Sequence, residues 1–355
     1  MSNSALSNNG LNNGTVNNAG VSSGGASSSG ASESSSSGSN GVSSGGGGGL
    51  SPVLLSPATA TVGNNTTPAQ TATTAGRNFS GAGPTVGTAF PLIQSVVTAT
   101  AGVLSPDTTT NTGGATIVVA PGGLVELKVP SLNIDVTVTN PALNAAGPGG
   151  TKVSLGTFEG TYFLAGVWGQ TGGSNVEAAH FVTGYQTPLS GMPSVGQATY
   201  SQSDSLLGMV ITKSATVATL QGDTTLTATF GTGLITGTLH NITARDVNSS
   251  AASAWNDVLV TAFIHSGSSA FDGSTFTNSS PNTTFSLGAS GRGSIAGNFY
   301  GPHVDEIGAV WTVTDSQATA FGAVGAKQSS SSGLPAGFSA TAVTPNAASL
   351  SRHSA

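Results

Sequence analysis

Cysteine is absent from this sequence of 355 residues, and charged side chains are scarce. Without cysteine there are no disulfide bonds, no thiolate metal sites and no acylated cysteine of the kind that anchors bacterial lipoproteins. Only 6% of the residues are charged, where a typical globular protein has about 25%. With only 8 Lys and Arg residues and a formal net charge of −6, the chain has few of the basic side chains that bind nucleic-acid phosphates.

Long apolar segments are missing as well. Residues 1–50 contain neither the basic stretch nor the apolar core of a secretory signal, so no export route is visible in the sequence. The longest apolar-leaning segment, Phe90–Leu104, is interrupted by Pro91 and Gln94 and is too short to span a bilayer. We therefore expect no transmembrane helix and no basic helix that would lie on a membrane surface.

Catalytic motifs are also missing, so an enzyme is not expected. The sequence contains no G-x-S-x-G elbow, no HExxH motif and no P-loop. Its densest polar cluster is His303–Glu306. His303 and Asp305 could bind a divalent cation, but two ligands fall short of the three or four that such sites need. The favoured interpretation is a polar hairpin corner in which Glu306 accepts backbone hydrogen bonds, and no metal site is predicted.

Glycine, serine, asparagine and threonine are abundant, and segments made mostly of them mark the predicted ends of the folded part. Residues 1–80 contain one acid, Glu33, and one base, Arg77. Such a segment buries too little apolar surface to offset the entropy of ordering, so a disordered low-complexity arm is predicted. Residues 328–355 have a similar composition and are predicted to form a flexible tail.

The remaining residues indicate an all-β protein in two parts. Residues 81–156 predict a small β-rich domain, in which residues 115–120 form a strand and residues 90–103 form either a short helix or a strand pair. Residues 157–327 contain eight or more segments with a period of two, which predicts an eight-stranded antiparallel β-barrel. Such a barrel either fills its interior with side chains or holds one small ligand.

The end of the predicted barrel has the clearest pattern. Ile295, Gly297 and Phe299 alternate with polar or small residues, and Gly301-Pro302 then interrupts the strand. The last segment, Ala318–Lys327, is expected to close the barrel by pairing with the first strand near Tyr162.

The sequence GNFYGPHVDEIG, followed by GAVGAK, resembles the terminal motif of the transferrin-binding-protein-B-like β-barrel domain, a family of bacterial surface and secreted ligand-binding proteins. Val304, Ala309 and Val324 depart from that motif. Some family members place a small "handle" domain before each barrel, which residues 81–156 resemble loosely. The matching positions are Gly297, Phe299, Tyr300, Gly301, Pro302, Glu306, Gly308, Gly325 and Lys327.

The resemblance implies an exported, non-enzymatic protein that captures an iron source at the cell exterior, either haem or an iron-carrying protein. Haem iron is commonly held by histidine, sometimes with tyrosine. His180, Tyr185, His265 and His303 are therefore candidate ligand-binding residues, with His240 as a further histidine. Lone histidines near strand ends are more often exposed to solvent or hydrogen-bonded.

Two further alternatives concern partners. Trp168, Tyr185, Tyr200, Trp255 and Tyr300 could form an exposed patch for a protein partner, because such interfaces favour Trp and Tyr. The alternating strand patterns around four aromatic residues favour burial in the barrel core instead; these are Trp168, Trp255, Phe299 and Trp311. The competing functional class is a structural or adhesive surface-matrix protein that associates with itself.

Overall fold

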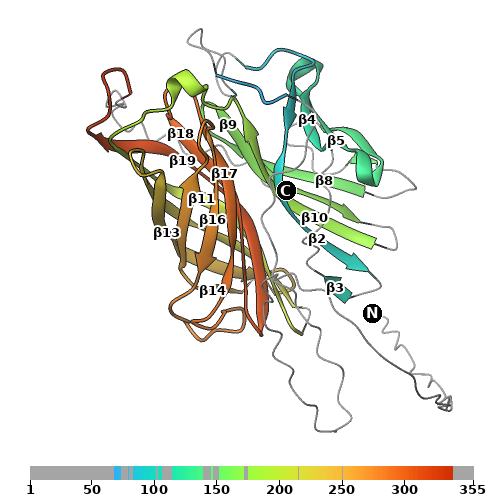
Figure 1. Ribbon diagram of the computed structural model, residues 1–355. Coiled ribbons are helices and arrows are strands. Elements are labelled where there is room, and N and C mark those ends of the chain that lie inside the picture. Colours follow the sequence, from blue (N-terminus) through green and yellow to red (C-terminus); the bar gives the residue numbers. More distant parts are fainter. Residues whose placement is uncertain are drawn as a thin grey trace, which may run out of the picture. The chain divides into compact units, whose positions relative to one another are not determined.

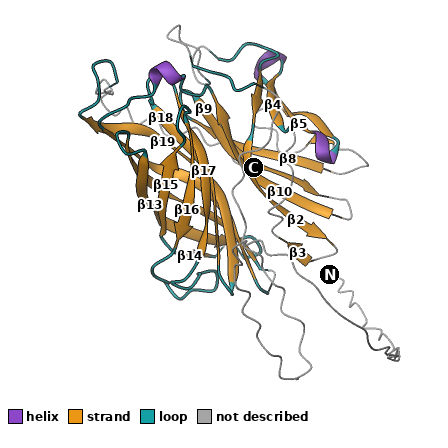
Figure 2. Cartoon of the chain, viewed as in Figure 1, coloured by secondary structure: helices purple, strands orange, loops and turns teal. Residues whose placement is uncertain are grey.

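The computed structural model describes residues 68–72, 79, 83–100, 103–105, 114–138, 145–146, 152–171, 175–214, 216–249 and 251–338. Within these residues almost every regular element is a strand, joined by short 3-10 turns (Figure 2). No helix in this part of the chain is long or apolar enough to cross a membrane. The predicted all-β fold class is confirmed.

Four short antiparallel strands form the first sheet, in the order β1-β4-β5-β6. Two of them, β4 and β5, are labelled in Figure 1. The 3-10 turns η1 (Pro121–Gly123) and η2 (Pro130–Leu132) separate β4, β5 and β6, because proline cannot donate to a sheet. The strand predicted at residues 115–120 is confirmed as β4. The four strands are β1 (Ala89–Pro91), β4 (Thr116–Val119), β5 (Val125–Val129) and β6 (Ile134–Val138).

A six-stranded antiparallel sheet follows, in the order β3-β2-β10-β9-β8-β7. Residues 90–103 were predicted to form either a short helix or a pair of strands. They form strands, which belong to both sheets. The members of the second sheet are β2 (Ile93–Thr100), β3 (Val103–Ser105), β7 (Ala145–Ala146), β8 (Lys152–Glu159), β9 (Phe163–Thr171) and β10 (Asn175–Gly184).

Eight further strands close into an antiparallel barrel. The sheet order is β12-β11-β19-β18-β17-β16-β15-β13, and pairing of β12 with β13 completes the ring. A short strand, β14 (Ala252–Ala254), adds to β13. The barrel strands are β11 (Gln197–Thr212), β12 (Val217–Thr229), β13 (Leu234–Asp246), β15 (Val258–Ile264), β16 (Ala270–Phe276), β17 (Arg292–Tyr300), β18 (Glu306–Thr314) and β19 (Ala318–Ser332).

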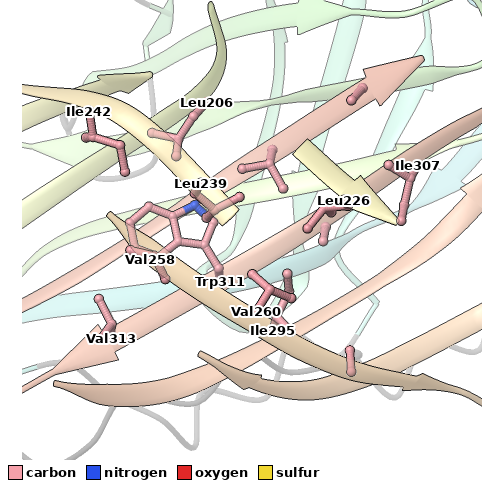
Figure 3. Packing of buried hydrophobic residues seen from close by; sticks show 14 of the residues in the cluster. Leu206, Leu226, Leu239, Ile242, Val258, Val260, Ile295, Ile307, Trp311 and Val313 are labelled. Carbon is pink, nitrogen blue, oxygen red and sulfur yellow. The ribbon is translucent and has the colours of Figure 1, made fainter. Parts of the chain in front are cut away.

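The barrel interior is filled by apolar side chains. Along β12 every second residue is buried, from Ala218 to Ala228, as a period of two requires when one face points inward. Trp311 lies within this core, with Leu239 and Val258 among the side chains around it (Figure 3). Of the two interiors that eight strands allow, the structure has the filled one.

The strand β18 is buried on both faces. All nine of its residues are buried, and its outward-facing Val310 packs in a cluster with Phe163 and Val182 of the six-stranded sheet. The wall made by β17, β18 and β19 is therefore covered on the outside by that sheet. A strand in this position becomes apolar on both faces, because neither face meets water.

The first strand of the barrel differs from the prediction. Residues 160–169 were expected to open the barrel at a boundary near residue 157, but β9 pairs with β8 and β10 in the six-stranded sheet. The ring begins at Gln197, and β19 closes on β11, with Phe321 opposite Met209. The segment is apolar on both faces because its sheet lies between the barrel wall and the four-stranded sheet, whose side chains pack with Leu164 and Trp168.

The predicted arm and tail also differ in part. The backbones of Gln70 and Ala72 hydrogen-bond to Gln186, and the Phe79 ring packs at a tilt against that of Phe90, with ring centroids 4.6 Å apart. The tail was expected to begin at residue 328, but β19 continues to Ser332. Residues 1–67 and 339–355 lie outside the described residues.

Candidate functional site

The first candidate region is the junction formed by Thr161, Tyr162, Glu306 and Lys327. Glu306 Oε1 accepts the backbone N–H of Thr161 at 2.6 Å, and Oε2 accepts that of Tyr162 at 2.7 Å. The Glu306 side chain is only 3% exposed. Burial raises the pKa of its carboxyl, against the lowering effect of the two backbone hydrogen bonds and of Lys327. Glu306 thus accepts backbone hydrogen bonds as predicted, although the donors belong to the turn before β9.

Lys327 sits at the edge of this junction. Its Nζ lies 3.9 Å from Glu306 Oε1 and donates to Thr161 Oγ1 at 3.2 Å. Because Lys327 is half exposed, water screens this pair and its contribution to stability is small. The two buried backbone hydrogen bonds of Glu306 are the stronger part of the junction, since charged acceptors strengthen hydrogen bonds.

Two glycines of the terminal motif allow the six-stranded sheet to approach the barrel. A Cβ at Gly325 would lie 2.3 Å from ring carbons of Phe163, and a Cβ at Gly308 would lie 2.7 Å from Val182 Cγ2. The next motif glycine, Gly301, has a φ of +89°, which L side chains rarely adopt. These positions of the motif therefore shape a packing surface between two sheets.

The aromatic motif residues point to opposite sides of the barrel wall. Phe299 packs inside, with its ring centroid 5.7 Å from that of Tyr200 and 5.6 Å from that of Phe230. Tyr300 lies outside, 6.2 Å from Phe163, and burial raises the pKa of its hydroxyl. Neighbouring side chains of β17 thus belong to two different clusters: Phe299 to the core inside the barrel and Tyr300 to the cluster between the barrel and the six-stranded sheet.

The other aromatic candidates are buried too. Trp168, Tyr185, Tyr200, Trp255 and Tyr300 are each at most 4% exposed, so the suggestion of an exposed aromatic patch is wrong. The predicted burial of Trp255, Phe299 and Trp311 in the barrel core is confirmed. Trp168 is buried as well, but it belongs with Tyr185 to the cluster between the first two sheets, so its placement in the barrel core is wrong.

His180 is the most deeply buried of the candidate ligand residues. It is 1% exposed, and its ring lies 5.0 Å from that of Phe321. Burial lowers the pKa of its imidazole to about 3. Among the described residues its Nδ1 has no hydrogen-bond partner. Tyr185, 1% exposed, packs edge-on against Phe90 at 5.0 Å. Iron could reach either side chain only if the sheets separated.

The remaining histidines lie on separate elements. His265 Nε2 is 3.1 Å from Asp272 Oδ1, and both side chains are exposed. The backbone N–H of His303 donates to Asp305 Oδ2 at 3.0 Å, and the His303 ring lies 5.2 Å from Phe338. His240 Nε2 is 3.1 Å from Thr225 Oγ1. In the described ranges no three His, Asp or Glu side chains gather in a way that could hold a metal ion.

A second candidate region, the rim, lies at one end of the barrel and comprises residues 187–196, 230–233, 265–269 and 301–305. Backbone hydrogen bonds join its parts: Phe230 donates to Gly196, and Ile264 donates to Gly233. The 3-10 turn η4 (Leu189–Gly191) belongs to this rim. Sequence reasoning did not identify the rim, because its residues come from turns that share no periodic pattern.

Large apolar side chains are exposed at and beside the rim. Leu189 is 62% exposed, Val195 52% and Phe263, on the strand that enters the rim, 57%. Each of these three side chains is available for a contact with another macromolecule.

The eight strands and the packed interior define a closed β-barrel domain. Residues 192–328 match a family model described as the C-lobe and N-lobe beta barrels of Tf-binding protein B. The barrel is therefore a TbpB-like β-barrel domain. The match begins five residues before β11 and agrees with the observed start of the ring.

Three solved structures are similar to parts of this chain. A TbpB double mutant from Haemophilus parasuis Hp5 is 18% identical, with 67% of this chain and 44% of that chain covered and a TM-score of 0.43. TbpB from serogroup B Neisseria meningitidis is 16% identical, with 66% and 43% covered and a TM-score of 0.40. The N-lobe of lactoferrin binding protein B from Moraxella bovis is 13% identical, with 51% and 80% covered and a TM-score of 0.31.

This chain spans less than half the length of those TbpB structures. No curated protein matches it. The family assignment of the barrel accordingly rests on the family model.

Proposed function

We propose that this protein is a non-enzymatic binding protein, exported or displayed on a bacterial surface, that captures an iron source. The observation that carries the proposal is the match of the barrel to the family of Tf-binding protein B. The proteins of similar fold are named for binding transferrin and lactoferrin. The resemblance of the terminal motif supports the same class.

An iron-carrying protein fits the geometry better than haem. The barrel interior is filled by side chains, and both His180 and Tyr185 are buried, so a small planar ligand has no route to them without sheet separation. A protein partner needs only an external surface. Leu189, Val195 and Phe263 supply exposed apolar area for such a contact.

A binding experiment tests the proposal. The purified full chain is immobilised, and iron-loaded transferrin, lactoferrin and haemoglobin are each passed over it, with serum albumin as the control protein. Saturable binding of one iron carrier, and none of albumin, supports the proposal. Equal binding of all four proteins, or of none, contradicts the protein-capture function.

Two further measurements separate the alternatives. A haemin titration that gives a Soret shift, lost when His265 and His303 are replaced by alanine, would assign the iron source to haem at exposed histidines. Concentration-dependent association in light scattering, without binding of any iron carrier, would favour the self-associating matrix protein.

A further inference from the structure

A polar pocket lies at the end of the barrel opposite the rim. Its volume is about 380 Å³, within the usual range for small-molecule sites of roughly 300–1,000 Å³. Three segments meet there: the β11–β12 hairpin, the loop between β16 and β17, and the β18–β19 turn. The lining residues are Thr212, Lys213, Ser214, Thr284, Ser286, Gln317 and Ala318.

Hydrogen bonds fix the three segments relative to one another. Asp315 Oδ2 accepts the backbone N–H of Gly288 at 2.6 Å, which ties the β16–β17 loop to the β18–β19 turn. Its Oδ1 accepts the N–H groups of Gln317 at 2.7 Å and Ala318 at 2.9 Å. The backbone N–H of Lys213 donates to the carbonyl oxygen of Gln317 at 2.7 Å, which adds the hairpin. The Asp315 carboxylate and one backbone–backbone hydrogen bond therefore hold the pocket together.

The lining of the pocket carries one positive charge. Lys213 is its single cation, and no carboxylate is among the lining residues. In the part of the chain that the structure describes, no Asp or Glu oxygen lies within ion-pair distance of Lys213 Nζ. The nearby Asp315 carboxylate is already engaged by three backbone N–H groups. An exposed ammonium is thus available to an anionic group.

Hydroxyl and amide groups make up nearly all the rest of the lining. Thr212 Oγ1 and Ser286 Oγ are already engaged within their own turns: Thr212 Oγ1 lies 2.9 Å from Ser214 Oγ and accepts the N–H of Thr216, and Ser286 Oγ accepts the N–H of Thr283 at 2.9 Å and donates to its carbonyl oxygen at 2.8 Å. The side chains of Ser214, Thr284 and Gln317 are exposed and are the ones left to meet a ligand. Ala318 supplies the one apolar side chain, and no aromatic ring lines the pocket. An apolar ligand finds little contact there.

We propose that this pocket binds an acidic monosaccharide unit, such as a uronic or sialic acid residue, with its carboxylate on Lys213 and its hydroxyls on the side chains of Ser214, Thr284 and Gln317. The ammonium–carboxylate hydrogen bond is charge-assisted and supplies orientation. This inference goes beyond the proposed capture of an iron source and does not depend on it.

The test is a titration of the ¹⁵N-labelled full chain with methyl glucuronide and with N-acetylneuraminate, followed by NMR. We expect saturable shifts at the amides of Lys213, Ser214, Thr284 and Gln317. Methyl glucoside, which lacks the carboxylate, should bind at least tenfold more weakly. Sodium sulfate serves as an anion without sugar hydroxyls and should also bind at least tenfold more weakly.

Three variants test the roles of the residues. Lys213→Met should weaken binding at least tenfold, Lys213→Arg should retain it within about threefold, and Thr284→Val should weaken it a few-fold. Lys128→Met, which removes the same charge from β5, is the matched control and should leave binding unchanged. Absence of saturable shifts, unchanged affinity in Lys213→Met, or equal binding of sulfate and the acidic sugars overturns the proposal. An iron carrier has no part in these measurements, so their outcome is independent of the proposed function.

Discussion

Glu306 and Tyr162 are 144 residues apart in the sequence, yet the Glu306 carboxylate accepts the Tyr162 backbone N–H at 2.7 Å. The neighbouring oxygen accepts the N–H of Thr161. Through these two bonds the first residue of β18 holds the turn that precedes β9. The connection joins the six-stranded sheet to the barrel wall at a position buried from water.

Replacement of Glu306 by Gln should destabilise the protein. The Gln carbonyl oxygen can accept only one of the two N–H groups, and its own NH₂ group then faces the other donor. A buried donor without a partner costs about 1–3 kcal/mol. Urea unfolding, monitored by tryptophan fluorescence, measures the loss in the free energy of unfolding.

Glu126→Gln is the control for that substitution. Glu126 lies on β5 and pairs with Lys128 at 3.1 Å near the surface, where an ion pair contributes less than about 1 kcal/mol. If the two variants lose equal stability, the junction has no special role.

The buried imidazole of His180 predicts a pH dependence of stability. Burial lowers the pKa of His180 to about 3 in the folded protein, whereas unfolded histidine has a pKa near 6.5. Between these values the unfolded chain binds more protons, so the free energy of unfolding falls as the pH falls from 6.5 toward 3. His180→Phe removes this dependence, because phenylalanine cannot be protonated.

The measurement compares urea unfolding of the native protein and of His180→Phe at pH 6.5 and pH 4. We expect the native protein to lose about 2–3 kcal/mol more than the variant over this interval. Parallel loss in the two proteins would show that His180 is charged or accessible in the fold. NMR titration of the His180 ring gives an independent check, since no protonation should occur above pH 4.

A single methyl group at Gly325 should weaken the packing of the two sheets. Its Cβ would lie 2.3 Å from carbons of the Phe163 ring, so the ring or the strand must move. Overpacking of this kind typically costs about 1–3 kcal/mol. Gly231→Ala is the control, because its Cβ would meet nothing closer than 3.9 Å. Thermal unfolding should show a lower Tm for Gly325→Ala and little change for Gly231→Ala.

The rim predicts where a protein partner binds. Val195, 52% exposed, lies at the rim, and Val247, 51% exposed, follows β13 at the opposite end of the barrel. The two valines are matched in type and exposure. If the rim contacts the partner, Val195→Ser should weaken binding of the iron carrier about tenfold, since a central apolar contact contributes more than 1 kcal/mol. Val247→Ser should leave the affinity unchanged.

Phe263→Ala extends the same experiment to the adjacent strand. Phe263 is 57% exposed, so its removal costs little folding stability while it removes the largest exposed ring beside the rim. Equal affinity for the native protein, Val195→Ser and Phe263→Ala would place the contact elsewhere on the surface.

Much of the fold followed from the sequence because strands have a local pattern. The alternation of Ile295, Gly297 and Phe299 predicted β17, and the Gly301-Pro302 interruption predicted the turn after it. The motif around Phe299 and Glu306 predicted the family of the barrel, which the family model matches. Periodicity depends only on neighbours in the chain, and therefore it can be read without the structure.

The partner of each strand was decided by tertiary structure. Residues 163–171 are apolar on both faces, and that pattern is equally consistent with a strand in the barrel wall and with a strand of a sheet packed on its outside. Only the observed pairing assigns β9 to β8 and β10 and leaves β11 to close the ring with β19. The alternation of apolar residues along a strand indicates which of its faces is buried, but not which other element covers that face.

The candidate binding regions could not be predicted from the sequence either. His180 and His265 are both histidines in or next to predicted strands. The structure buries His180 against Phe321 and leaves His265 exposed beside Asp272. The pocket around Lys213 joins three turns that are separated by up to about a hundred residues. The sequence by itself determined the strands, the barrel family and the low charge of the surface. The structure alone decided which side chains face solvent together, because that depends on the contacts of the closed sheet.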